Sequence, residues 1–135
     1  MRHGFVRAAA ATPDIRVADV EYNTEKICEA IDQAAANGAK ILAFPELCIT
    51  GYTCSDLFTQ DILLKAAKEA LFKIAGYTAD KDMLVFVGAP LDVEGKLYNV
   101  AAALNRGRVI GLTTKTFLPN YGEFYEMRQF TPGPE

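Results

Sequence analysis

The sequence has a single histidine, His3, and three cysteines without a C-x-x-C pair. One histidine cannot complete a Ser-His-Asp triad, a Cys-His dyad or a multi-histidine metal site unless His3 itself takes part. The odd set of cysteines, Cys28, Cys48 and Cys54, predicts reduced thiols rather than a disulfide framework or a zinc site. If the protein is an enzyme, its general base must therefore be another side chain.

The chain also lacks a run of Lys or Arg and a long apolar stretch. Its formal net charge of −3 and its isoelectric point of about 5.2 argue against nucleic acid as a partner. The apolar runs are too short to span a membrane and the N-terminus has no signal-peptide core, so we expect a cytoplasmic protein. Half of the 135 residues are hydrophobic, which is enough for the core of one domain or part of one.

The first half of the chain reads as a strand-helix-strand unit followed by a helix. Strands are expected at 5–12 and 40–44, and the helix at 20–37 between them, capped by Asn23 or Thr24, favours a parallel pair of strands. A second helix is expected at 57–74, capped by Ser55 or Asp56, with Ile62 on its apolar face. Because its residues are small, the first strand is expected at the centre of the sheet.

The second half changes to the period of a β-meander. Strands are expected at 83–90, 97–104 and 109–114, with turns at Glu94-Gly95 and Asn105-Arg106-Gly107. These strands carry apolar and small residues on both faces, so both faces should be covered, by helices or by a second sheet. Together the crossover and the meander predict an α/β fold with a mixed sheet.

An acidic residue directly follows the second strand. Pro45 ends the apolar run 41–44, and Glu46 comes next, at the rim of an α/β sheet where ligands and catalytic groups collect. The alternative is a helix cap or a solvated charge. Lys115 similarly ends the last strand and opens a segment rich in Pro, Gly and aromatic residues, which predicts a loop packed over the core or forming the wall of a ligand pocket.

Two motifs, F-P-E-L-C-I-T-G-Y at 44–52 and K-T-F-L-P-N-Y-G-E-F-Y-E at 115–126, closely resemble the carbon-nitrogen hydrolase (nitrilase) superfamily. More narrowly, five stretches look like the N-terminal glutaminase domain of glutamine-dependent NAD synthetases: H-G-F-V-R at 3–7, G-Y-T-C-S-D-L-F-T-Q-D at 51–61, G-A-P-L at 88–91, Y-N at 98–99 and F-Y-E-M-R-Q-F-T-P-G at 124–133. The resemblance implies a four-layer α-β-β-α sandwich, of which residues 1–135 would be a truncated N-terminal portion.

The same resemblance implies a Glu-Lys-Cys triad. Glu46 matches the general base, Lys115 matches the lysine that stabilises the oxyanion, and Glu126 matches a second glutamate that supports the lysine and the substrate. Three aromatic residues resemble those that line the glutamine pocket: Tyr52, Tyr121 and Phe124. No cysteine stands where the family has its nucleophile.

The chemistry of amide hydrolysis asks for the same groups. An amide is a poor electrophile, so a covalent route needs a thiolate, a base to form it, and a positive charge where the carbonyl oxygen becomes negative. Glu46 and Lys115 would supply two of these three requirements. Cys48 and Cys54 are weak candidates for the third, because base and thiol must be closely placed.

The resemblance implies that the parent protein, a homo-oligomer, hydrolyses glutamine and passes ammonia to the amidation of deamido-NAD, which uses ATP and Mg²⁺ in its own synthetase domain. That domain's Ser-Gly-Gly-x-Asp-Ser loop is missing, so this chain should hold no cofactor or metal and be inactive alone. Two alternatives stay open. One is a stand-alone carbon-nitrogen hydrolase acting on an amide, nitrile or carbamoyl group; the other is a non-catalytic assembly module with Glu46 and Lys115 as a buried ion pair.

Overall fold

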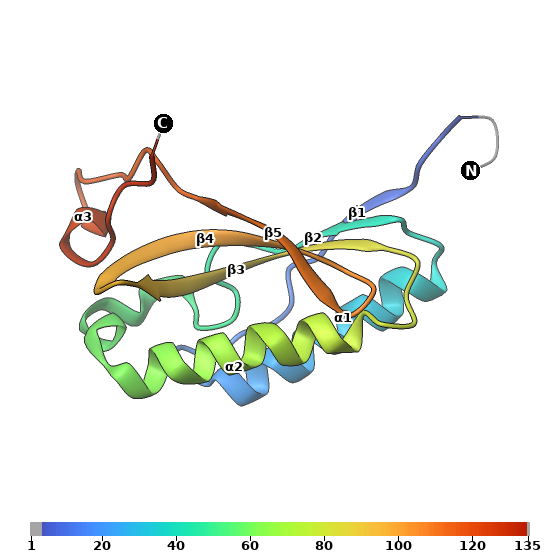
Figure 1. The fold of residues 1–135 in the computed structure, drawn as a ribbon, viewed down its shortest axis with the longest axis horizontal. Coiled ribbons are helices and arrows are strands. Elements are labelled where there is room, and N and C mark those ends of the chain that lie inside the picture. Colours follow the sequence, from blue (N-terminus) through green and yellow to red (C-terminus); the bar gives the residue numbers. More distant parts are fainter. Residues whose placement is uncertain (1–3, 135) are drawn as a thin grey trace.

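The computed structural model describes residues 4–134, so His3 lies outside the described residues. A five-stranded mixed sheet has the strand order β1-β2-β3-β4-β5 (Figure 1). The strands are β1 (Ala8–Ala10), β2 (Ile41–Ala43), β3 (Leu84–Val93), β4 (Lys96–Asn105) and β5 (Arg108–Thr114). The helices are α1 (Val20–Ala36), the 3-10 segment η1 (Tyr52–Thr59), α2 (Asp61–Tyr77) and the short α3 (Glu126–Gln129).

Strand pairing follows the connections between the strands. β1, β2 and β3 run parallel to one another, because α1 and α2 provide the crossovers, while β3, β4 and β5 form an antiparallel meander. Both meander turns have two residues with positive φ, Glu94 at 53° and Gly95 at 75° in the first, as expected for a type I′ hairpin. The predicted parallel pair and the predicted meander are confirmed.

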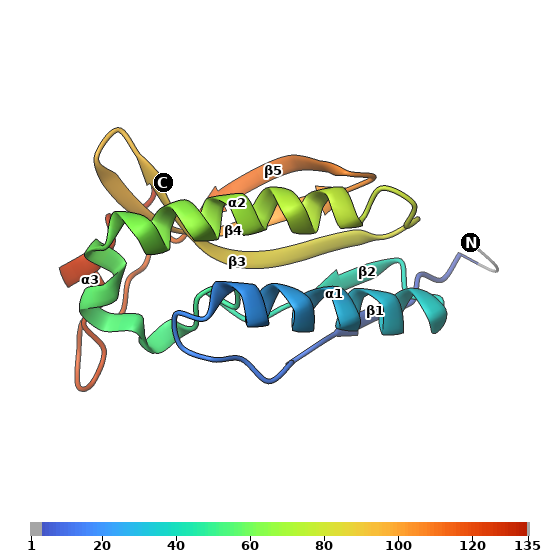
Figure 2. The same ribbon diagram turned by 90° about the horizontal axis from the view of Figure 1, so that it is seen from below.

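Both long helices cover the same face of the sheet (Figures 1 and 2). Along β2 and β4 the residues that face the helices, such as Leu42 and Ala102, are buried, while their neighbours Ala43 and Ala101 are exposed. The main core therefore lies between the helices and the sheet. Cover on both faces was expected, but neither long helix lies on the second face. No helix in residues 4–134 is long and apolar enough to cross a membrane.

Several local predictions were wrong. The N-cap of α1 is Asp19, whose carboxylate accepts a hydrogen bond from the Tyr22 N–H at 3.2 Å, whereas Asn23 and Thr24 are buried inside the helix. α2 begins at Asp61, because the preceding residues form η1 instead. Ile62 is 79% exposed, because the buried face of α2 begins with Leu63 and continues through Ala67. β1 has three residues and lies at the edge of the sheet, so its alanines do not mark a central strand.

Candidate active site

Glu46 is carried by a tight turn that lies directly on β3. Beyond β2 the chain stays paired through Phe44, whose N–H donates to the Phe86 carbonyl at 2.9 Å. After Pro45 it turns, with Leu47 at a φ of 50°. A Cβ at Gly88 of β3 would lie 2.9 Å from the Glu46 carbonyl carbon, and the Leu47 nitrogen would be closer still. Gly88 is thus the residue that lets the backbone of this turn approach the sheet.

Lys115 is held from both sides by backbone hydrogen bonds. Its N–H donates to the Asn99 carbonyl of β4 at 2.8 Å, and its own carbonyl accepts from the Gly133 N–H at 2.9 Å. The C-terminal segment packs closely against the end of β5, because a Cβ at Gly133 would lie 2.7 Å from the Thr114 Cβ. The position of the lysine therefore depends on β4, β5 and the segment at 131–133.

The structure brings the two acids and the amine together. The Lys115 Nζ lies 2.8 Å from the Glu46 Oε1 and 2.9 Å from the Glu126 Oε1. Burial of Lys115 opposes its charge, but the hydrogen bonds to Glu46 and Glu126 outweigh burial and raise the pKa of Lys115 above its ordinary value. The amine is consequently a fixed positive charge at neutral pH.

Glu126 is the most buried member of this group, with 5% of its side chain exposed. Its Oε1 accepts a second hydrogen bond, from the Tyr52 hydroxyl at 2.7 Å. Burial and the nearby Glu126 carboxylate both raise the pKa of Tyr52, which keeps the phenol protonated as a donor. The Glu126 Oε2 is buried without a hydrogen-bond partner in the described part of the chain, so this carboxylate has capacity for one more donor.

An open cavity of about 290 Å³ adjoins this cluster. Glu46, Lys115 and Asn99 are among its polar lining residues, and Phe44 and Phe86 are among its apolar walls. The Asn99 Nδ2 donates a hydrogen bond to the Glu46 Oε1. Sequence reasoning gave Asn99 no role in the site, although a polar residue in the apolar strand β4 was a usable signal.

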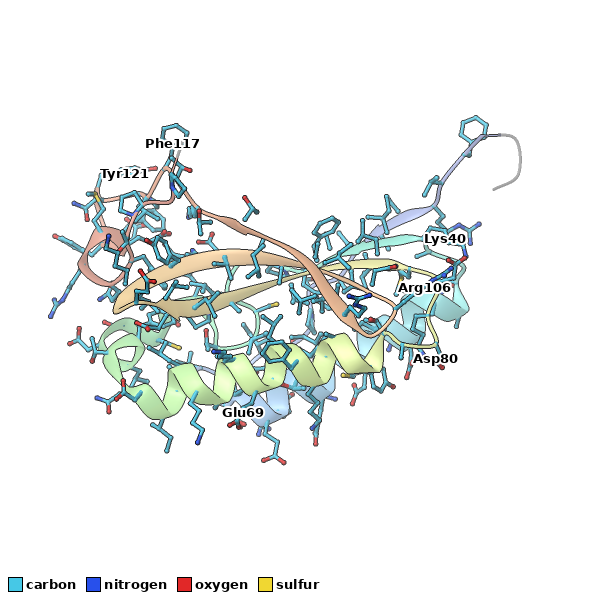
Figure 3. All side chains as sticks on the ribbon, viewed as in Figure 1. Lys40, Glu69, Asp80, Arg106, Phe117 and Tyr121 are labelled. Carbon is cyan, nitrogen blue, oxygen red and sulfur yellow. The ribbon has the colours of Figure 1, made fainter. Side chains whose placement is uncertain are left out.

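The three aromatic residues expected in the glutamine pocket lie in a chain of edge-on contacts. Tyr52 and Phe124 have ring centroids 6.4 Å apart and line, with Glu126, a second cavity of about 280 Å³. Tyr121 lies 5.8 Å from Phe124 but is 72% exposed, in the loop that follows β5 (Figure 3). The structure thus places Tyr52 and Phe124 beside the acids and Tyr121 at the outside.

Two of the thiols are far less accessible than a nucleophile has to be. Cys48 is 0% exposed and Cys54 is 2% exposed, and neither lines the two cavities beside the acids. Burial raises the pKa of Cys48 to about 11, so its thiol stays protonated at neutral pH. Both cysteines are core residues.

Comparison with known proteins gives a consistent family. The glutamine-dependent NAD(+) synthetase of Mycobacterium tuberculosis is 39% identical over 132 residues, which are 98% of this chain and 19% of that protein. The crystal structure of a glutamine-dependent NAD(+) synthetase from Cytophaga hutchinsonii matches 96% of this chain and 22% of its own, with a TM-score of 0.91 and 39% identity. An amidase from Nesterenkonia sp. matches with a TM-score of 0.81 and 27% identity, over 100% of this chain and 51% of its own.

This chain therefore spans about a fifth of the length of the curated relatives that it matches. The structural matches confirm the predicted α/β fold of the nitrilase type. The carbon-nitrogen hydrolase family itself matches residues 7–135. This span includes Glu46 and Lys115, which the structure places in contact, and the chain belongs to the carbon-nitrogen hydrolase family.

Proposed function

We propose that residues 1–135 are the N-terminal portion of the glutaminase domain of a glutamine-dependent NAD synthetase. The parent protein would hydrolyse the side-chain amide of glutamine and deliver ammonia to its own synthetase domain, which would bind ATP and Mg²⁺ and amidate deamido-NAD. One observation carries the proposal: the Lys115 ammonium lies between the carboxylates of Glu46 and Glu126 beside an open cavity. The relatives named above support the choice of glutamine over other amides.

In this proposal Glu46 moves the proton and Lys115 holds the negative charge. The nucleophile would be a cysteine of the parent protein outside these residues. Glu46 takes the S–H proton, and the thiolate adds to the amide carbon to form a tetrahedral intermediate. The Lys115 ammonium stabilises the oxygen that becomes negative. Glu46 then gives its proton to the departing nitrogen, the C–N bond breaks, and ammonia is released. A thioester remains on the cysteine, and water hydrolyses it.

The neighbouring residues would hold these groups and the substrate in place. Glu126 fixes the Lys115 ammonium, and Tyr52 fixes Glu126 through its hydroxyl. Phe124 would form part of the wall against the aliphatic stem of glutamine, and Tyr121 would close the outer side of that wall. Because the thiol is supplied from elsewhere, the chain alone would not turn over. We expect the complete protein to be a homo-oligomer.

A substrate panel on the purified full-length parent protein tests this function. Ammonia release is measured with glutamine, asparagine, acrylamide and a simple nitrile, and NAD formation from deamido-NAD is measured with ATP and either glutamine or ammonia. The proposal predicts a strong preference for glutamine and ATP-dependent NAD formation from both nitrogen sources. Hydrolysis of acrylamide without NAD formation would instead identify a stand-alone amidase, the class of the Nesterenkonia relative. No hydrolysis of any compound would favour the assembly module.

A further inference from the structure

Asn99 is a buried polar residue in a strand that packing alone would fill with an apolar one. It lies in β4, is 4% exposed, and is followed by the buried residues Val100 and Ala102. Burying an amide is unfavourable unless its donors and acceptors are satisfied, and Asn is disfavoured in strands. The hydrogen bond from its Nδ2 to the Glu46 Oε1 satisfies one of those donors. The partner of this amide is thus the same carboxylate that the proposed mechanism uses as base.

The sheet puts Asn99 between the two residues of the proposed site. In the β3–β4 register Asn99 pairs with Pro90, two positions from Gly88, on which the Glu46 turn rests. On its other side the Asn99 carbonyl accepts from the Lys115 N–H at 2.8 Å, which continues the β4–β5 ladder. Asn99 therefore fixes the backbone of Lys115 and the side chain of Glu46 at once, from the interior of a rigid sheet.

The hydrogen bonds to Glu46 are unequally shared between its two oxygens. Oε1 accepts from the Lys115 Nζ at 2.8 Å and from the Asn99 Nδ2. Within residues 4–134 no side chain donates to Oε2, and the Glu46 side chain is 39% exposed. Two donors on one oxygen fix the plane of a carboxylate and reduce its capacity to accept a proton there.

We propose that Asn99 is a positioning residue for the glutaminase reaction: it fixes the Glu46 carboxylate so that Oε2 is the oxygen that takes the thiol proton. This inference rests on the function proposed above. In the step that it concerns, the S–H bond breaks, the new O–H bond forms at Oε2, and the thiolate keeps the electron pair. Asn99 donates to Oε1 before and after the transfer, so the carboxyl group does not have to rotate between the two proton transfers.

The test uses three variants of the full-length parent protein. Asn99→Leu removes the amide but keeps the branched shape of the side chain, and Asn99→Asp removes the donor and places a second acceptor beside Glu46. The matched control is Asn105→Asp in the same strand, because the Asn105 Nδ2 donates to the Met83 carbonyl at 3.0 Å at the opposite end of β4. Steady-state glutaminase kinetics, ammonia-driven NAD formation and melting temperature are measured for each variant.

For Asn99→Leu we expect kcat for glutamine to fall by about 10- to 100-fold with KM changed by less than about twofold, because proton transfer and not binding is impaired. Asn99→Asp should be slower than Asn99→Leu, since two acceptors then face each other. Ammonia-driven NAD formation should stay at the wild-type rate in both, and Asn105→Asp should keep wild-type kinetics even where its melting temperature falls.

Each contrary outcome has a distinct meaning. Wild-type kcat in both Asn99 variants would overturn the inference while leaving the glutaminase function intact. A loss of kcat that follows melting temperature equally in Asn99→Leu and Asn105→Asp would also overturn it, because Asn99 would then be a structural residue only. If the wild-type protein releases no ammonia from glutamine, the proposed function itself fails.

Discussion

Replacing Gly88 by alanine should damage the proposed site through backbone displacement alone. A Cβ at this position would lie 2.8 Å from the Pro45 carbonyl oxygen and 2.9 Å from the Glu46 carbonyl carbon, whereas ordinary contacts begin at 3.4 Å. The obstructing atoms belong to the backbone of a turn and cannot rotate away. The turn that carries Glu46 must therefore move outward, by about 1 Å.

A displacement of this size should reduce both activity and stability. Misplacing a catalytic group by about 1 Å can cost about 100-fold in rate, whereas an extra methyl group in a packed region costs about 1–3 kcal/mol. Glutaminase kcat and the melting temperature of the parent protein are the two measurements. Gly111→Ala is the matched control, because Gly111 lies in β5 of the same sheet and a Cβ there meets nothing within 4 Å.

The result that would refute this reasoning is a Gly88→Ala protein with wild-type kcat. It would mean that the turn absorbs the methyl group without moving the carboxylate, so that the contact between Gly88 and the turn does not set the position of Glu46. An equal loss of activity in Gly111→Ala would show that added volume anywhere in the sheet has the same effect.

Three further predictions concern Tyr52, Lys115 and the Cys48 thiol. Tyr52→Phe should lower stability by about 1 kcal/mol and kcat severalfold, because Glu126 loses its neutral donor while the ring contacts remain, and unchanged values in thermal melts and kinetics would contradict it. Lys115→Met should lower the stability measured by urea unfolding by about 3 kcal/mol, because it leaves Glu126 buried and unpaired. Because the pKa of Lys115 is raised, the stability that its ammonium contributes is complete below the unfolded pKa of 10.5 and is lost only as the pH rises through the folded pKa. The difference in unfolding free energy between the wild type and Lys115→Met should therefore be present at neutral pH, and its absence there would contradict the prediction. The Cys48 thiol, with a pKa of about 11, should resist iodoacetamide at mildly alkaline pH until urea is added, and rapid labelling of the folded protein, seen by peptide mass spectrometry, would refute its burial.

Much of the site could be predicted because two rules placed its residues. Glu46 follows a parallel strand, and Lys115 follows the last strand of a meander, so both fall at ends of strands in one sheet. Their contact at 2.8 Å could not be read from that pattern, since the twist of the sheet and the turn over Gly88 decide which side chains meet. The family motifs indicated the pairing before any geometry was known.

Other features of the structure could not be predicted from local sequence patterns. Ser55 looked like a helix cap, yet it has a φ of 51° inside η1, where the chain kinks before α2 begins. Propensity could not predict this, because the buried residues Cys54 and Phe58 hold η1 in place through tertiary packing. Asn99 was given no role at the site for a related reason: a polar residue in an apolar strand indicates that it has a partner, but that partner, Glu46, is 53 residues away and no local pattern identifies it.

The most direct test of the proposed site compares two sources of nitrogen in Glu46→Gln and Lys115→Met variants of the parent protein. NAD formation is measured with glutamine and, separately, with ammonia, which does not require the glutaminase site. We predict that glutamine-driven formation falls by about 1,000-fold or more in both variants while ammonia-driven formation keeps the wild-type rate. Glutamine-driven formation at the wild-type rate in either variant would contradict the assignment of Glu46 and Lys115 to this chemistry.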